Sequence, residues 1–404
     1  MDSQITVSSV RDTVTSPEDA KHQFPIHYAY DHLHGKLDFL TLPQLKLNEH
    51  LRQRDFLPNR IPSEHGISID PVAAGLPWAS GVLSVRQNKH WRSALQATID
   101  WLKAFGDAKD MDGVPSKRGR SVAEFARHEL AAGLENGWFR FPIYMSPDAD
   151  EQRVKLLSFA NILIFLFDDF WETHDLDVVS GLHRVFITRL KPETASVDEP
   201  QTSLEKLVDA AVTEMLELDR LNNNHAGRRT LELIIGFFSR PAPPDKYESL
   251  EDFLVYRRED AAVSYVLGTI AFALNSGVDV FAPHLARLVK LWSNQISIAN
   301  DVFSWEKEKR DYDEKKVLYL INTVDVCRRV LGLASHDAAL TMTQALLFQI
   351  ERELDNEIAR LRAEDALTPE EWRFVDGMCY TMMGNMFCSV VMSRYGGEEA
   401  RLRD

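Results

Sequence analysis

Residues 161–175, NILIFLFDDFWETHD, join an apolar run to a cluster of carboxylates. The apolar residues extend back to about position 156 and leave almost no polar face, which is typical of a helix inside a bundle. Segments 263–274 and 378–392 have the same character. We therefore expect a helical bundle with several interior helices, and the carboxylates that begin at Asp168 should lie at the end of one of them.

The periodicity beyond residue 88 predicts an all-α domain. Between positions 91 and 105, apolar residues recur every three to four positions, as in an amphipathic helix. Capping boxes at Ser121–Glu124 and Thr368–Glu371 indicate two helix starts. Alternating β-type runs are nearly absent. The other predicted helices cover residues 151–174, 201–221, 224–240, 249–275, 279–309, 313–331, 336–364 and 369–395.

The chain divides into four predicted parts. Residues 1–22 read as a flexible tail, and residues 23–88, which are rich in Pro, His and Gly, as an irregular segment packed on the bundle. Residues 89–396 form the helical domain, and residues 397–404 form a polar C-terminal tail.

Composition limits the possible partners. The chain of 404 residues carries 46 Lys and Arg against 61 Asp and Glu, a formal charge of −15 that argues against binding to nucleic acid or an anionic membrane. Its longest apolar runs are too short to span a bilayer, and the N-terminus does not resemble a signal peptide. Three cysteines without a metal-type spacing make a disulfide framework improbable. We expect a cytoplasmic protein.

Two sets of oxygen-bearing side chains have the spacing of metal ligands. Asp168 and Glu172 are four residues apart and share one face of a helix. Asn300, Ser304 and Glu308 form a second ladder at the same spacing. Carboxylate, amide and hydroxyl oxygens suit Mg²⁺. The alternatives are a solvated helix end and a polar stripe on a surface helix, and Asp169, Asp175 and Asp177 are interpreted as solvated charge.

The two motifs, DDFWE and NDVFSWEKE, resemble the paired metal motifs of class I terpene synthases. Arg257 lies 43 positions before Asn300 and Asp260 follows it, which is similar to the diphosphate-sensing arginine and RxxD of that family. Arg394 and Tyr395 match its C-terminal Arg-Tyr pair, and Lys307 matches a basic residue before the last glutamate. The chain departs from the pattern in having Glu172 where Asp is usual, and Ala261 where Gly is frequent.

The resemblance implies a single-domain class I terpene synthase-like bundle around a central active-site cavity. It implies several Mg²⁺ ions, replaceable by Mn²⁺, and a prenyl diphosphate that is ionised and cyclised. The metal ligands would be Asp168, Glu172, Asn300, Ser304 and Glu308. The residues binding the diphosphate would be Arg257, Lys307, Arg394 and Tyr395. Of these, Asp168, Asn300, Ser304, Glu308 and Arg257 would be the catalytic residues.

Aromatic side chains near these motifs are candidates for the walls that stabilise a carbocation. Phe165 lies one turn before Asp168, and Phe387 lies two turns before Arg394. Tyr265 and Trp292 are weaker candidates. For each ring, ordinary core packing is the competing interpretation.

Several functions remain open at this level. The compact domain with a C-terminal Arg-Tyr is similar to microbial, fungal-type sesquiterpene synthases, which favours farnesyl diphosphate over C10 and C20 substrates. A prenyl transferase, a prenyl diphosphate hydrolase and a non-enzymatic helical binding protein are the alternatives. The expected assembly is a monomer or a homodimer.

Overall fold

The computed structural model describes residues 17–34, 45–56, 63–109, 120–134, 137–173, 187–193, 200 and 202–402. Most of the predicted tail, together with Asp175 and Asp177, lies outside these ranges. The helices are α1 (Pro17–Ala20), α2 (Lys46–Phe56), α3 (Trp91–Asp107), α4 (Val122–Ala132), α5 (Arg140–Met145), α6 (Glu151–Thr173), α8 (Ser203–Asn222), α9 (Ala226–Phe238), α10 (Leu250–Asp260), α11 (Val263–Ala273), α12 (Ala286–Asp313), α13 (Thr323–Val330), α14 (His336–Ala363), α15 (Pro369–Val391) and α16 (Ser393–Gly396). A 3₁₀ turn, Pro283–Leu285, precedes α12.

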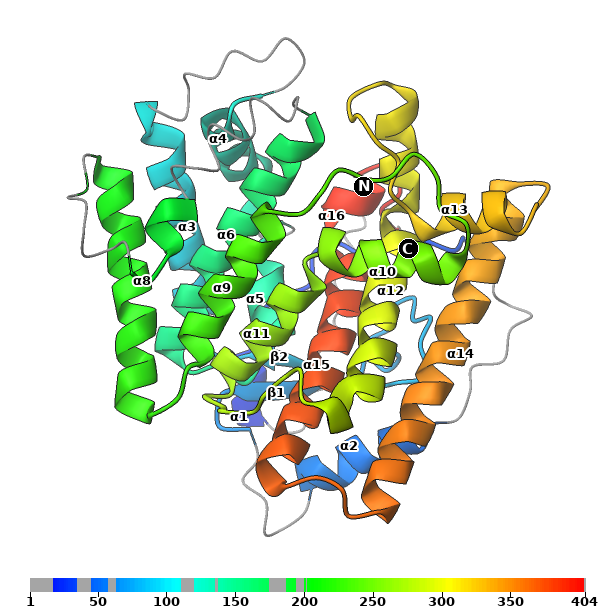
Figure 1. Ribbon diagram of the computed structural model, residues 1–404, viewed down its shortest axis with the longest axis horizontal. Helices are drawn as coiled ribbons and strands as arrows, with labels where there is room; N and C mark the ends of the chain where they lie inside the picture. The colour runs from blue at the N-terminus through cyan, green and yellow to red at the C-terminus, as the bar shows by residue number, and fades with distance from the viewer. Residues whose placement is uncertain are drawn as a thin grey trace.

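The long helices pack into a bundle (Figure 1). Helix α12 packs against both α14 and α15, α11 packs against α9, and α3 packs against α4 and α6. The short helix α5 lies against α15. Strands β1 (Gly66–Ile69) and β2 (Val85–Asn88) form an antiparallel pair in which Gly66 is opposite Asn88. The predicted all-α fold class is confirmed, with one small hairpin added to it.

The helices predicted to be interior are buried. In α11, every residue from Tyr265 to Ala273 is buried, and in α15 the same holds from Phe374 to Val391. Helix α6 buries nearly all of its apolar run. Their lack of a polar face follows from this position, because each is surrounded by other elements on most sides.

Two helix predictions were wrong in detail. The helix predicted over 249–275 is divided into α10 and α11 at Ala261–Ala262, where Ala262 has a left-handed φ of 54°. Periodicity continues across this break because both helices bury apolar residues. The segment predicted as helix 313–331 is helical only in α13, which begins after the Asn322 N-cap. In residues 23–88, predicted to be mostly irregular, the structure describes α2 and the two short strands as regular elements.

An N-terminal strap, which we define as residues 24–33, packs beside the C-terminal segment of the chain around α16. The Tyr30 amide donates to the Val390 carbonyl at 3.1 Å, and the Leu402 amide donates to the Ala29 carbonyl at 2.8 Å. The Tyr28 hydroxyl donates to the Gly397 carbonyl at 2.7 Å. The strap therefore fixes the backbone on both sides of α16.

Among the residues that the structure describes, none of the helices combines the length and the apolarity that a bilayer crossing requires.

Candidate active site

The first predicted motif lies at the C-terminal end of α6, and its leading aspartate is held by an arginine from a distant segment. Arg240, which follows α9, donates from Nη2 to Asp168 Oδ1 at 2.5 Å. Its Nε lies 3.4 Å from Asp260 Oδ1 at the end of α10. The guanidinium carbon is 4.2 Å from the centre of the Trp171 ring and 4.0 Å from that of Phe237. Arg240 thus bridges two carboxylates between two aromatic faces.

Arg257 occupies the centre of a second group of charges. Its Nη1 lies 2.5 Å from Asp260 Oδ2, and its Nη2 lies 2.6 Å from Asp301 Oδ1. The same Nη2 donates to Asn300 Oδ1 at 3.1 Å. Asp260 is therefore shared by Arg240 and Arg257. A continuous chain of ion pairs and hydrogen bonds connects Asp168 on α6 with Asn300 on α12.

The second predicted motif lies along one side of α12. The Asn300 amide Nδ2 donates to the Tyr395 hydroxyl at 3.0 Å, and Glu308 Oε2 accepts from Asn322 Nδ2 at 2.9 Å. Ser304 lies between them and is fully buried. Among the described residues its hydroxyl has no hydrogen-bond partner. A buried hydroxyl without a partner is costly, so this position suits a group that supplies the missing contact.

The C-terminal pair lies close to both motifs. Arg394 of α16 donates from Nη2 to Asp169 Oδ1 at 2.6 Å, and its guanidinium carbon lies 5.5 Å from the Trp138 ring centre. Asp169 is thus paired, which corrects its interpretation as solvated charge. The adjacent Tyr395 is buried and contacts Asn300.

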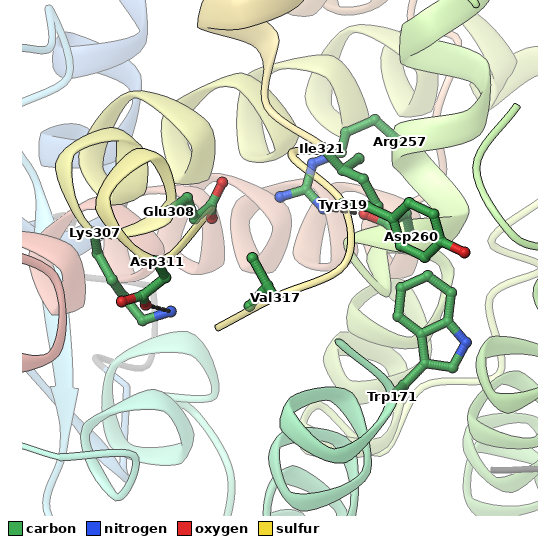
Figure 2. A pocket seen from close by; sticks show the side chains of 9 residues that line it. All are labelled: Trp171, Arg257, Asp260, Lys307, Glu308, Asp311, Val317, Tyr319 and Ile321. Atoms are coloured by element: carbon green, nitrogen blue, oxygen red, sulfur yellow. Dashed lines mark hydrogen bonds and ion pairs between the residues drawn. The ribbon is translucent and has the colours of Figure 1, made fainter. Parts of the chain in front are cut away.

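A small pocket that is open to solvent lies between Arg257 and Glu308 (Figure 2). The Glu308 carboxylate and the Arg257 guanidinium face each other across it. Lys307 Nζ lies 3.3 Å from Asp311 Oδ2, and the rings of Trp171 and Tyr319 have centres 5.9 Å apart. The pocket is lined by Trp171, Arg257, Asp260, Lys307, Glu308, Asp311, Val317, Tyr319 and Ile321.

Burial and crowded charge shift the pKa values of several groups here. Desolvation, and then the neighbouring Asp260 and Asp169, raise the pKa of Asp168, while Arg240 opposes this shift. Desolvation also raises the pKa of Asp301, against the effect of Arg257. Burial raises the pKa of Tyr395 to about 12, so its hydroxyl stays protonated and able to donate. The paired arginines are therefore what favours the ionised aspartates.

The other predicted residues are more dispersed. Phe165 is partly buried and stacks on Trp138, with ring centres 5.2 Å apart, and it also contacts Phe141 at 4.7 Å. Phe387 is fully buried against Tyr144 at 4.6 Å and is absent from the lining of the described pocket. The weaker candidates are both buried: Trp292 Nε1 donates to the Met378 carbonyl at 2.7 Å, and the Tyr265 hydroxyl has no partner among the described residues. The Glu172 side chain lies outside what the structure describes.

The donor set fits a divalent metal ion. An aspartate, an amide oxygen, a hydroxyl and a glutamate are oxygen ligands of the kind that hard cations take, and the Ser304 hydroxyl lacks a partner. Within the described part of the chain, no three His, Cys, Asp or Glu side chains converge as a complete metal site. The remaining ligands would thus come from amide and hydroxyl groups, from substrate or from water.

Sequence reasoning missed two residues of this site. Arg240 lies in the segment FFSRPAPP, where no motif singles it out, and only the fold brings it to Asp168. Asp301 was visible as the second letter of NDVFSWEKE, yet its role as the buried partner of Arg257 was not predicted. The available signal was its place beside Asn300, the first residue of the ligand ladder, and only the structure shows that its carboxylate is fully buried.

The chain is similar to known proteins over most of its length. The family model "Terpene synthase family 2, C-terminal metal binding" matches residues 160–353, which include both motifs. Terpene cyclase 6 of Gibberella fujikuroi is 24% identical over 368 residues, covering 89% of this chain and 91% of that protein. These matches support a class I terpene synthase, the family that the two motifs resemble.

Two further likenesses agree with this family. Aristolochene synthase of Aspergillus terreus is 25% identical, covering 71% of this chain and 88% of that protein. The fold is similar to that of a crystal structure of α-eudesmol synthase, with a TM-score of 0.54 and 17% identity, covering 75% of this chain and 95% of that one. The likenesses are consistent with a terpene cyclase, and the matched family implies a divalent metal ion and a small prenyl diphosphate substrate.

Proposed function

We propose that this terpene synthase ionises farnesyl diphosphate and cyclises the allylic cation to a sesquiterpene hydrocarbon or alcohol, with release of diphosphate. One observation carries the proposal. Glu308 of the α12 ladder lines the same pocket as Arg257 and Lys307, and ion pairs connect this pocket to Asp168. Cationic donors and oxygen ligands are thereby gathered at one opening, which is the arrangement that a diphosphate with bound metal ions requires.

The charge of the pocket supports a metal-dependent reaction. Its lining contains two cations, Arg257 and Lys307, and three carboxylates, those of Asp260, Glu308 and Asp311. A bare diphosphate would meet a net negative surface, and divalent ions would reverse that sign. We propose that Asp168, Asn300, Ser304 and Glu308, together with Glu172, hold Mg²⁺ ions, which neutralise the leaving group as Lewis acids.

The chain's own residues would bind and orient the diphosphate. Arg257, Lys307 and Arg394 are each paired with a carboxylate in this structure, so substrate has to replace those partners. Arginine suits this exchange because its planar fork can donate to two phosphate oxygens at once. The protonated Tyr395 hydroxyl would add a fourth donor.

The aromatic rings near the pocket would keep water away from the allylic carbocation. Trp171 and Tyr319 lie next to each other at the pocket (Figure 2), and Phe165 stacks on Trp138 behind Asp168. Aromatic faces stabilise a cation without offering it a nucleophile. We propose the same role for Phe387, at a deeper level of the bundle.

We propose Mg²⁺ as the physiological ion, with Mn²⁺ as a substitute, because the candidate ligands are all hard oxygens. Treatment with a chelator should abolish turnover, and adding back Mg²⁺ or Mn²⁺ should restore it, whereas Ca²⁺ should restore little. Turnover that survives complete chelation would contradict the metal assignment.

Farnesyl diphosphate is favoured by the compact domain and by the resemblance to microbial sesquiterpene synthases. We further propose that the protein acts in the cytoplasm, as a monomer or a homodimer. The decisive experiment incubates the purified protein with geranyl, farnesyl and geranylgeranyl diphosphates and Mg²⁺, followed by analysis of volatile products. A cyclic C15 product made from farnesyl diphosphate is expected, and the proposal fails if no substrate gives a cyclic terpene.

The same assay distinguishes the alternatives. A linear C15 alcohol as the sole product would indicate a diphosphate hydrolase, and a longer prenyl diphosphate would indicate chain elongation. A cyclic C10 or C20 product would retain the mechanism and change the substrate.

A further inference from the structure

The most unusual contact of the site is the one between Arg240 and Asp168. The Arg240 side chain is only 2% exposed, and its Nη2 lies 2.5 Å from Asp168 Oδ1, on the carboxylate proposed as a metal ligand. An ammonium or guanidinium that neutralises a carboxylate occupies the place where a metal ion would bind to it. The Asp168 carboxylate therefore cannot bind a metal ion at full strength while it is paired with Arg240.

Arg240 has a second carboxylate within reach. Its Nε already lies 3.4 Å from Asp260 Oδ1, while the other oxygen of Asp260 is held by Arg257 at 2.5 Å. Asp260 therefore divides its charge between two arginines. If Arg257 turns toward a diphosphate, Asp260 loses its closest cation and becomes a stronger partner for Arg240.

The surroundings of Arg240 allow such a shift without exposing its charge. The guanidinium lies between the rings of Trp171 and Phe237, whose faces stabilise a cation, and Nη1 lies 3.4 Å from the Phe237 carbonyl. A small movement toward Asp260 keeps these contacts. The head group then stays buried and paired, as a desolvated cation requires.

We infer that Arg240 is a positioning residue that occupies Asp168 until diphosphate engages Arg257, and that it then moves to Asp260 and releases Asp168 to metal. This inference rests on the proposed metal role of Asp168. Its consequence is positive coupling, since diphosphate increases the affinity of the Asp168 side for metal beyond any direct bridging. By reciprocity, metal at Asp168 strengthens diphosphate binding by the same factor.

The test measures Mn²⁺ binding by the loss of the electron paramagnetic resonance signal of the free ion, with no turnover involved. Without diphosphate, Arg240→Gln should bind Mn²⁺ at least roughly ten-fold more tightly than the wild type, within the usual range of coupling. Arg258→Gln is the charge-matched control, because Arg258 adjoins Arg257 on α10 and lies near Glu251, at 3.8 Å. It should leave the Mn²⁺ affinity within about two-fold, since Asp168 is paired with Arg240 and not with Arg258 among the described residues.

Inorganic pyrophosphate tests the coupling. It should increase the Mn²⁺ affinity of the wild type by a larger factor than that of Arg240→Gln, because the variant has no arginine to release. The increase in Mn²⁺ affinity that Arg240→Gln causes should disappear in the double variant with Asp168→Asn. The Mn²⁺ affinity of Arg240→Lys should lie between those of the wild type and Arg240→Gln, since one ammonium cannot bridge both carboxylates as the guanidinium does.

Three results would overturn the inference: unchanged or weaker Mn²⁺ binding in a folded Arg240→Gln protein, an equal gain in Arg258→Gln, or an equal effect of pyrophosphate in variant and wild type. If Arg240→Gln does not fold, the Arg240→Lys affinity decides in its place. A wild type that binds no Mn²⁺ even with pyrophosphate would instead overturn the proposed function, so the two failures can be told apart.

Discussion

The Ser304 hydroxyl is buried on α12, and no described residue contacts it with a hydrogen bond. The change Ser304→Ala replaces the hydroxyl with hydrogen and removes an unsatisfied polar atom, so it should leave the melting temperature of the metal-free protein unchanged or slightly higher. If the hydroxyl binds metal, turnover should fall by at least about ten-fold. Thermal denaturation without metal and initial rates with Mg²⁺ measure the two effects.

A destabilised Ser304→Ala protein with normal turnover would contradict this assignment. Ser297 provides a control, because its hydroxyl is also buried and without a partner among the described residues of the same helix. Ser297→Ala should share the effect on stability and show a smaller loss of turnover.

His32 makes stability dependent on pH. Its ring is fully buried, stacks on Phe303 with centres 3.7 Å apart, and has no partner for either nitrogen among the described residues. Burial lowers the pKa of His32 from 6.5 to about 3. The unfolded chain therefore takes up a proton on this residue below pH 6.5 that the folded protein does not.

The stabilising effect of a neutral His32 is complete above pH 6.5 and is lost on acidification toward pH 3. Between pH 7 and pH 5, this residue should lower the free energy of unfolding by about 2 kcal/mol. His32→Phe should remove that part of the pH dependence. Urea denaturation of both proteins at pH 5, 6 and 7 measures the difference, and parallel curves would show that His32 is not the cause.

Helices α5 and α15 are in close backbone contact at Gly384. A Cβ atom at this position would lie 2.0 Å from the Tyr144 carbonyl oxygen and 3.1 Å from the Met145 amide nitrogen. Because both atoms belong to the backbone, no side-chain rotation relieves the overlap. Gly384→Ala should lower the free energy of unfolding by at least about 3 kcal/mol, measured by chemical denaturation.

Gly236 is the matched control in α9. It is exposed, and a Cβ there would meet no heavy atom within 4 Å. Gly236→Ala should raise stability by up to about 1 kcal/mol, because alanine favours the helix. Equal effects of the two substitutions would show that the contact between α5 and α15 can adjust.

The sequence predicted most elements because their signals are local. Capping boxes at Ser121 and Thr368 start α4 and α15 as expected. The break at Ala262 left no such signal, because alanine rarely adopts a positive φ and only the packing of α10 and α11 imposes it. Helix ends that are set by tertiary contacts cannot be predicted from the periodicity of the sequence.

The sequence predicted those residues of the candidate site that belong to recognisable motifs. The spacing of Asn300, Ser304 and Glu308 placed them on one side of α12, and the structure brings Arg257 and Tyr395 to Asn300. Arg240 was not predictable, because its partners lie 72 and 20 positions away and no periodic pattern relates them. The roles of Asn300, Ser304 and Glu308 as metal ligands remain predictions, and the metal-binding experiments test them.

At the scale of the whole molecule, the N-terminal strap joins segments that are far apart in the chain. The Tyr30 hydroxyl donates to the Phe303 carbonyl at 2.6 Å, directly before Ser304, and the Tyr28 hydroxyl donates to the Gly397 carbonyl. Replacing both tyrosines with Phe should lower the free energy of unfolding by about 2 kcal/mol. Amide hydrogen exchange should accelerate in residues 393–402.

Helix α14 is the internal reference for that measurement, since the hydrogen bonds of the two tyrosines do not involve it. Its exchange should change only as much as global stability does. Uniform acceleration in both regions would mean that the strap contributes to stability without holding the C-terminal segment in particular.

The strap also sets an order of events during synthesis. Tyr28 and its partner Gly397 are separated by 369 residues. At about 5 to 20 residues per second, the ribosome needs roughly 20 to 70 s between the two. Until Gly397 is made, the Tyr28 hydroxyl lacks this partner, whereas Phe24 can pack on Trp91 and Phe139 and Tyr30 can bind Phe303 earlier. A chaperone that binds short apolar segments therefore has an opportunity to hold the strap before its last contact forms. The contact that holds the backbone after α16 therefore forms long after the strap itself has been made.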